Sequence, residues 1–106
     1  MLFRSRLVTR GTLAQFVQRD GSVPGSTRAL GWDTASPDSS AGPRLSASAF
    51  GHTGFAGTSI WVDPARELFV VLLTNRVYPS RQNQALIGLR PRLHTAIVDA
   101  LAEAGG

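Results

Sequence analysis

The stretch Leu68–Thr74, LFVVLLT, has no polar residue before its final threonine, and it constrains the fold more than any other segment. A strand that is apolar on both faces is normally covered on both faces. It follows Thr58–Asp63, TSIWVD, whose alternation places Ile60 and Val62 on one face and Trp61 on the other. The intervening DPARE is a turn, and strands joined by short connections form an antiparallel meander.

Two further strands are predicted before this pair. Phe50–Gly54 is the first strand of the meander, and Arg28–Thr34, RALGWDT, alternates with Leu30 and Trp32 on one side. Between them, Ala35–Ala49 is rich in Ser, Ala, Pro and Gly, which predicts a long loop. Because loops of this length are uncommon in compact domains, we expect it to be functional or mobile.

Two helices are predicted at the ends of the chain. Thr12–Arg19 has helical apolar spacing, and Thr12 with Gln15 fits a capping box. The C-terminal helix is expected to have Pro91 in its first turn. Its apolar stripe would be Leu93, Ile97 and Leu101. The predicted fold is therefore α+β, with an antiparallel meander of about three to four strands flanked by both helices on one face. We expect residues 1–106 to form a single partial domain.

Composition excludes several kinds of chemistry. All 11 basic residues are arginine, so no lysine can act as a general base or form a Schiff base. The absence of cysteine excludes disulfides and thiolate metal sites. The net charge of +4 is compatible with binding to nucleic acid or an acidic membrane, but the arginines are spread from Arg4 to Arg92 with no run of three. This spacing favours a solvated surface over a nucleic-acid interface.

No stretch approaches the roughly 18 consecutive apolar residues of a membrane span. The first residues, MLFRSRLVTRG, are too interrupted by arginine for a signal peptide. The sequence leaves the compartment open between cytoplasm and periplasm.

The segment FGHTGFAGTSIWVD, Phe50–Asp63, contains small or polar residues where a strand is expected. Thr53, Gly54 and Gly57 interrupt it, and His52 opens the triplet His-Thr-Gly. Such residues form either an ordinary turn or one wall of an active site. His94 lies on the flank of the C-terminal helix, where we expect it to face solvent, and both tryptophans are expected in the core or at its rim.

An ordered set of motifs resembles the C-terminal third of the serine β-lactamase-like hydrolases. The set is Leu-Gly-Trp, Gly-His-Thr-Gly, a strand ending Asp-Pro, and FVVLLTNRVYP before a terminal helix. This superfamily includes class C β-lactamases, penicillin-binding DD-peptidases and related esterases. The resemblance covers the chain from about Thr12 to Ala104.

The resemblance implies acyl transfer to water through a serine acyl-enzyme, with an ester, amide or β-lactam as substrate. His52 would point into the site, and Thr53 would contact the polar tail of the substrate. Gly54 would leave room for substrate along the strand. The backbone N–H of Phe55 would be one of two oxyanion donors. These residues would lie at an exposed rim, and no metal or organic cofactor is implied.

The sequence departs from the family pattern in two motifs. It has no lysine and therefore no S-x-x-K, and its one tyrosine, Tyr78, is not part of a Y-x-N. Ser80 and Asn83 stand where class C β-lactamases place the Asn and Arg that hold the β-lactam carboxylate, which favours an esterase or peptidase relative. We therefore expect the C-terminal portion of a truncated or split serine hydrolase, inactive alone.

The alternative is an interaction module without catalytic function. It would dock through an apolar sheet face on a separately encoded partner, such as a complementary N-terminal fragment. Because the family pairs the strand matching Leu68–Thr74 with an N-terminal strand, we expect an open edge there and self-association.

Overall fold

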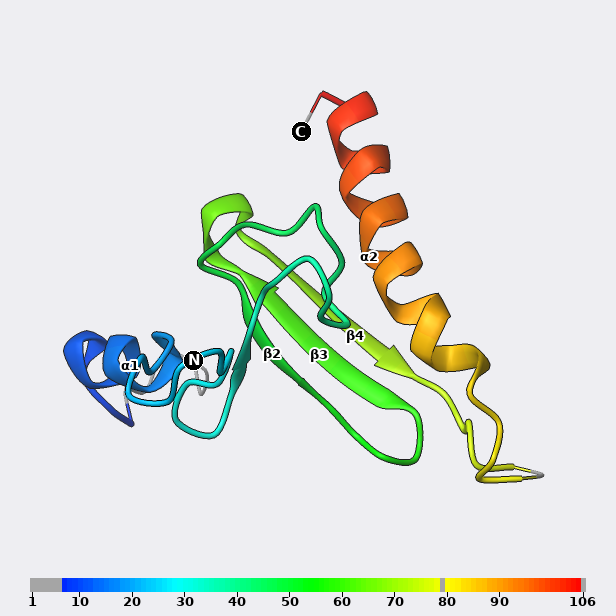
Figure 1. Cartoon of the computed structure of the whole chain (residues 1–106). Coiled ribbons are helices and arrows are strands. Elements are labelled where there is room, and N and C mark those ends of the chain that lie inside the picture. The colour runs from blue at the N-terminus through cyan, green and yellow to red at the C-terminus, as the bar shows by residue number, and fades with distance from the viewer. Residues whose placement is uncertain (1–6, 79, 106) are drawn as a thin grey trace.

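The computed structural model describes residues 7–78 and 80–105. Its elements are α1 (Arg10–Val17), β1 (Asp33–Thr34), β2 (Phe50–Thr53), β3 (Thr58–Asp63), the 3₁₀ turn η2 (Pro64–Arg66), β4 (Leu68–Leu73) and α2 (Ala85–Glu103). The strands form one antiparallel sheet in the order β1-β2-β3-β4, shown in Figure 1. The α+β class and the meander are confirmed. In the described part of the chain β4 is an edge strand, as expected.

The two faces of the sheet differ sharply in burial. Trp61 lies opposite Val70 and Ile60 opposite Val71, and residues paired in this way share a face. The covered face carries the buried side chains of β3, which are Ser59, Trp61 and Asp63. The open face carries Ile60, Phe69, Val71 and Leu73, of which the last three are 69%, 51% and 76% exposed.

The covered face is packed by the segment between β1 and β2. As predicted, Ala35–Ala49 contains no helix or strand. It nevertheless supplies most of the hydrophobic core, which consists of Ala35, Ala41, Leu45, Ala49, Trp61 and Val98. Packing of small alanine side chains against the indole of Trp61 explains how so long a loop is held in place.

Ser40 connects this loop to both neighbouring layers. Its hydroxyl accepts a hydrogen bond from the indole N–H of Trp61 at 2.9 Å. Its carbonyl lies 2.8 Å from Nδ1 of His94 on α2. The loop therefore joins α2 to the sheet.

The C-terminal helix corrects three expectations. It begins at Ala85, where the Asn83 side chain accepts from the backbone N–H, so Pro91 lies inside the helix instead of in its first turn. The buried stripe consists of Leu86, Arg90, His94 and Val98 instead of Leu93, Ile97 and Leu101. His94 is completely buried instead of solvent-facing. The Ser40 carbonyl pairs with its Nδ1, whereas its buried Nε2 has no hydrogen-bond partner among the described residues.

Two predictions for the N-terminal part of the chain are also corrected. Helix α1 is capped by Thr9, whose hydroxyl accepts from the Thr12 N–H at 3.1 Å, instead of by Thr12. The predicted strand Arg28–Thr34 is wrong except for its last two residues. The Ala29 N–H donates to the Trp32 carbonyl, and Gly31 has a φ of +80°, so a tight turn replaces extended backbone. In Figure 1, α1 lies beyond the side of the sheet formed by β1 and β2.

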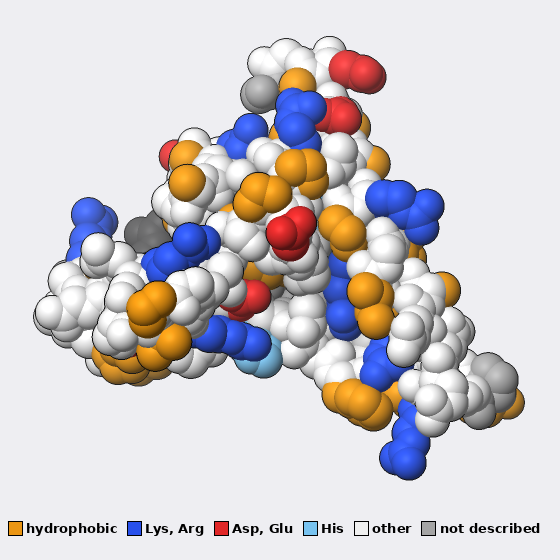
Figure 2. Space-filling model, viewed as in Figure 1, with side chains coloured by type: hydrophobic (Ala, Val, Ile, Leu, Met, Phe, Trp, Pro, Cys, Tyr) orange, Lys and Arg blue, Asp and Glu red, His pale blue; other side chains and the backbone are white. Residues whose placement is uncertain are grey.

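Two surface properties follow from the fold. No helix in residues 7–78 and 80–105 combines the length and apolar character needed to cross a bilayer. Arginine side chains are scattered over the face seen in Figure 2 and do not gather into one basic patch there.

Candidate functional site

The His-Thr-Gly triplet lies where β2 loses one of its neighbours. Strand β1 pairs only with Phe50 and Gly51, whereas His52 and Thr53 pair with β3 alone. Beyond Gly51, the side of β2 that faces away from β3 therefore has no partner strand in the described chain. Gly54 and Gly57 lie in the turn that joins β2 to β3. The triplet is thus both the start of an ordinary turn and an exposed rim.

His52 is exposed, and its ring is held by the backbone of its neighbour. Its Nδ1 lies 2.7 Å from the Thr53 carbonyl oxygen. Because a carbonyl oxygen can only accept, Nδ1 carries the hydrogen, and the neutral ring offers Nε2 as an acceptor. Such an imidazole can take up a proton at Nε2 without losing the contact that orients it.

The turn after the triplet leaves two backbone donors, those of Phe55 and Ala56, without a partner in the described chain. The Gly54 N–H donates to the Thr58 carbonyl at 2.7 Å. The Phe55 N–H has no hydrogen-bond partner among the residues that the structure describes. A Cβ on Gly54 would collide with the Thr58 hydroxyl, so the local structure also requires glycine at this position. Gly57, with a φ of +121°, completes the turn in a conformation that favours glycine.

Two arginines hold this turn, and the sequence did not single out either of them. Arg76, which follows β4, donates from Nε to the Phe55 carbonyl at 2.6 Å, and its guanidinium carbon lies 4.5 Å from the centre of the Phe55 ring. Arg90 on α2 donates from Nη2 to the carbonyls of Gly54 and Thr58, at 3.2 and 2.9 Å. One signal was available for Arg90. It interrupts the stripe of residues four apart that begins at Leu86.

A shallow hollow of about 370 Å³ borders the triplet. Its lining combines the polar end of β2 with apolar side chains of the open face, and consists of His52, Thr53, Gly54, Thr58, Ser59, Ile60, Val71 and Leu73. The structure therefore brings three of the four predicted site residues to one hollow. Phe55 follows immediately in the turn.

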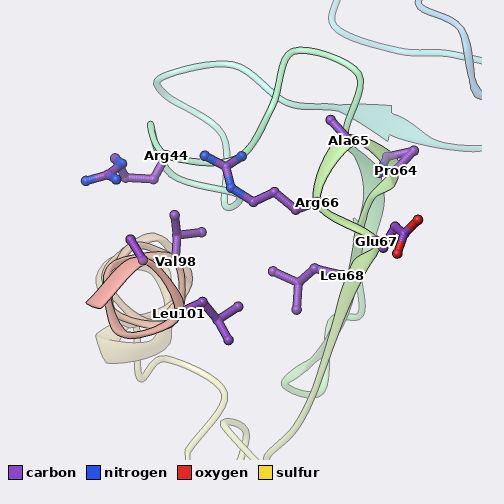
Figure 3. A pocket seen from close by; sticks show the side chains of 9 residues that line it. Arg44, Pro64, Ala65, Arg66, Glu67, Leu68, Val98 and Leu101 are labelled. Carbon is purple, nitrogen blue, oxygen red and sulfur yellow. The ribbon is translucent and has the colours of Figure 1, made fainter. Parts of the chain in front are cut away.

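A larger cavity, about 750 Å³, lies elsewhere between η2 and the second half of α2 (Figure 3). Arg44 and Arg66 line it together with Leu68, Val98 and Leu101. Each arginine is already paired with a carboxylate, Arg44 with Asp99 and Arg66 with Asp63. Because no residue of the triplet reaches this cavity, we place the candidate site at the smaller hollow.

The loop after β4 is linked to the site by Arg76. Its Nη1 donates to the carbonyls of Arg81 and Asn83, at 3.2 and 3.0 Å. The Asn83 side chain accepts from the Ala85 N–H at the start of α2, and Ser80 is exposed. Tyr78 is also exposed and makes no hydrogen bond in the described chain that would place it beside His52.

Comparison with known proteins gives two curated relatives. The chain is 43% identical over 58 residues to "N-acetylmuramyl-L-alanine amidase" of Bacillus subtilis (strain 168), covering 52% of this chain and 13% of that protein. It is 36% identical over 74 residues to "Putative D-alanyl-D-alanine carboxypeptidase" of Salmonella typhi, covering 67% of this chain and 17% of that protein. The chain thus spans less than a fifth of either relative.

No solved structure gives a significant match to the chain. The Beta-lactamase family model, in contrast, matches residues 2–91, which is most of the sequence. The match includes β1 to β4, the triplet and the first turns of α2. The chain therefore belongs to the Beta-lactamase family.

Proposed function

We propose that this chain supplies one wall of the acyl-transfer site of a serine hydrolase. His52 moves protons, Thr53 binds the polar tail of the substrate, and Gly54 leaves the strand edge free for it. The Phe55 N–H is one of two donors to the oxyanion. The nucleophilic serine and its lysine come from the portion of the enzyme that carries S-x-x-K, since this sequence contains no lysine.

One observation carries this proposal: the free N–H of Phe55 follows, in the turn after β2, the exposed and backbone-oriented imidazole of His52. An oxyanion donor must be unpaired before substrate arrives, and a proton-transfer group must be accessible. The names of both relatives describe cleavage of amide bonds beside alanine. They favour an amide substrate over a β-lactam.

The decisive variant is His52→Ala in a complete enzyme that contains this sequence. Loss of an acid–base participant lowers the rate of acyl transfer by roughly 10²–10⁴-fold. Stopped-flow acylation with a chromogenic ester measures it, and Gln15→Ala, on the distant helix α1, is the matched control. A change of less than about threefold would leave His52 with only a structural role.

The isolated chain should be inactive. Without lysine and Y-x-N it has one oxyanion donor and a histidine, but no activated nucleophile. We expect no hydrolysis of chromogenic esters or cephalosporins above background. Turnover that survives purification and disappears when one serine of this chain is replaced would contradict the proposal.

The alternative function is docking on a separately encoded partner through the open face, and the exposure of Phe69, Val71 and Leu73 favours it. The coding sequence upstream of Met1 discriminates between the two. S-x-x-K and Y-x-N encoded there make the chain the C-terminal portion of a serine hydrolase, whereas unrelated sequence favours an independent module.

A further inference from the structure

The buried arginine of α2 makes an unusual contact with the candidate site. Arg90 is 7% exposed, and its Nη2 reaches the carbonyls of Gly54 and Thr58, which lie at the two ends of the turn between β2 and β3. These partners are 36 and 32 residues away in sequence. One guanidinium nitrogen therefore fixes both ends of the turn to α2.

The contacts of the Gly54 carbonyl determine where the neighbouring N–H points: it accepts from Arg90 and from the Gly57 N–H, each at 3.2 Å. The Gly54 carbonyl and the Phe55 N–H belong to the same peptide group, and in a planar trans peptide they point in opposite directions. A carbonyl held towards Arg90 directs the Phe55 N–H away from α2. This N–H has no partner within residues 7–78 and 80–105.

A second arginine fixes the other end of the Phe55 residue. Arg76 donates to the Phe55 carbonyl and stacks on its ring. The peptide groups before and after the Phe55 Cα are therefore both held by guanidinium groups. Rotation of the Phe55 N–H out of position would require breaking at least one charged hydrogen bond.

The two arginines also concentrate positive charge at the turn. The ion pairs in the described chain are Arg44–Asp99 and Arg66–Asp63, so neither Arg76 nor Arg90 has a carboxylate partner there. Burial, and then the charge of Arg76, lower the pKa of Arg90. Two nearby cations without an acid are unfavourable for folding alone, but they favour a negative charge that develops beside them.

We propose that Arg90 is a positioning residue for acyl transfer, which holds the Gly54–Phe55 peptide so that the Phe55 N–H faces the developing oxyanion. Arg76 is its second support. In the step concerned, the serine proton passes to the lysine of S-x-x-K while the serine oxygen bonds to the substrate carbonyl carbon. The carbonyl π pair moves to oxygen, and the Phe55 N–H donates a hydrogen bond to the oxyanion that forms. This inference rests on the proposed function, and it names residues outside the triplet.

The first test uses the chain alone and needs no activity. In ¹H–¹⁵N spectra, Arg90→Ala should shift the Phe55 amide resonance because the hydrogen bond to the preceding carbonyl is lost. Adding guanidinium ion at a concentration well below denaturation should move it back. Arg92→Ala is the matched control, since Arg92 is exposed on the same helix and its side chain donates to the Gly88 carbonyl of that helix. A Phe55 resonance unmoved by Arg90→Ala, or one that guanidinium does not restore, overturns the inference.

Arg90→Lys covers the case in which the alanine variant does not fold. Lysine keeps the charge but lacks the planar fork of arginine, so it should shift the Phe55 amide by an intermediate amount. The indole N–H of Trp61, bonded to Ser40, reports whether the fold is intact. An intact Trp61 signal with an unchanged Phe55 signal in Arg90→Lys would equally overturn the inference.

The second test uses a complete enzyme that contains this sequence. Arg90→Ala should lower kcat by about 10²-fold, the effect of a misplacement of roughly 1 Å, with KM nearly unchanged. Guanidinium should recover part of kcat. A loss expressed only in KM or in the folded fraction overturns the positioning role. An unmodified enzyme without acyl-transfer activity refutes the proposed function itself, whereas the Phe55 spectra still decide the role of Arg90 in holding the peptide.

Discussion

The covered and open faces of the sheet do not follow the usual rule that polar side chains face solvent and apolar side chains are buried. The covered face buries Ser59 and Asp63 beside Trp61, whereas the open face exposes Phe69, Val71 and Leu73. Two polar side chains are therefore buried on one face, while three large apolar side chains are exposed on the other. Burial on this sheet is decided by what packs on it, namely the Ala35–Ala49 loop joined to α2 through Ser40, and the open face lacks such a layer in the described chain.

The largest effect should come from removing the centre of the covered face. Trp61→Ala takes away the largest buried side chain and its hydrogen bond to Ser40, and we expect a loss of about 3–5 kcal/mol in the free energy of unfolding. Urea denaturation measures it. Phe69→Ala on the open face is the matched control and should change stability by less than about 0.5 kcal/mol. Equal losses from both variants would remove the distinction between the faces.

A smaller effect should follow from acidification. Burial lowers the pKa of His94 below its usual 6.5, and the backbone groups of Ser40 and Arg90 only partly offset this. The unfolded chain then binds more protons than the folded one below about pH 6.5, so stability is full above that pH and falls as the pH is lowered. For one group, the free energy of unfolding changes by at most about 1.4 kcal/mol per pH unit. Thermal midpoints measured between pH 7.5 and 5 report it, and His94→Gln should flatten the curve.

Asp63 should add a second decline at lower pH. Burial raises the pKa of this carboxyl, but hydrogen bonds from Ser46 and the charged Arg66 outweigh burial, so its pKa lies below 3.8. Its contribution is therefore present above about pH 4 and is lost as the pH falls through the folded value. Asp63→Asn should remove this decline and leave the one due to His94, and loss of both in that variant would assign them to a common cause.

The smallest effect on stability, but a clear one on association, is expected at the open face. Phe69→Ser and Leu73→Ser should leave the free energy of unfolding within about 0.5 kcal/mol, because both side chains are already exposed. They should reduce self-association, since apolar side chains beside an open strand edge promote it. Light scattering at high micromolar concentration measures the change. A stable monomer before mutation would count against the open face as a docking surface.

The strands were largely predictable because their information is local. Alternation in β3 and the uninterrupted apolar run of β4 are periodic patterns, and both elements are found as predicted. Arg28–Thr34 shows the same alternation, but the turn at Gly31 overrides it. The start of α2 was missed because the helix begins at Ala85, well before the proline, where the Asn83 side chain accepts from the Ala85 N–H.

The site was only half predictable. The motif pattern pointed to His52, Thr53, Gly54 and Phe55, and their roles remain proposals. Arg76 and Arg90 escaped notice because their partners lie 21 to 36 residues away in sequence, beyond any local pattern. The burial of His94 has the same origin, since its partner Ser40 is 54 residues distant.

The bridging position of Ser40 also has a kinetic consequence. The strands β2 to β4 are joined by short turns and can form early, whereas the bond from Ser40 to His94 closes a loop of 54 residues. Long closures cost more chain entropy and are completed late in folding. Helix α2 should therefore be the last element to dock and the first to detach. Amide exchange would then show α2 opening while the hairpin stays intact, and each opening would briefly release the Gly54 carbonyl from Arg90.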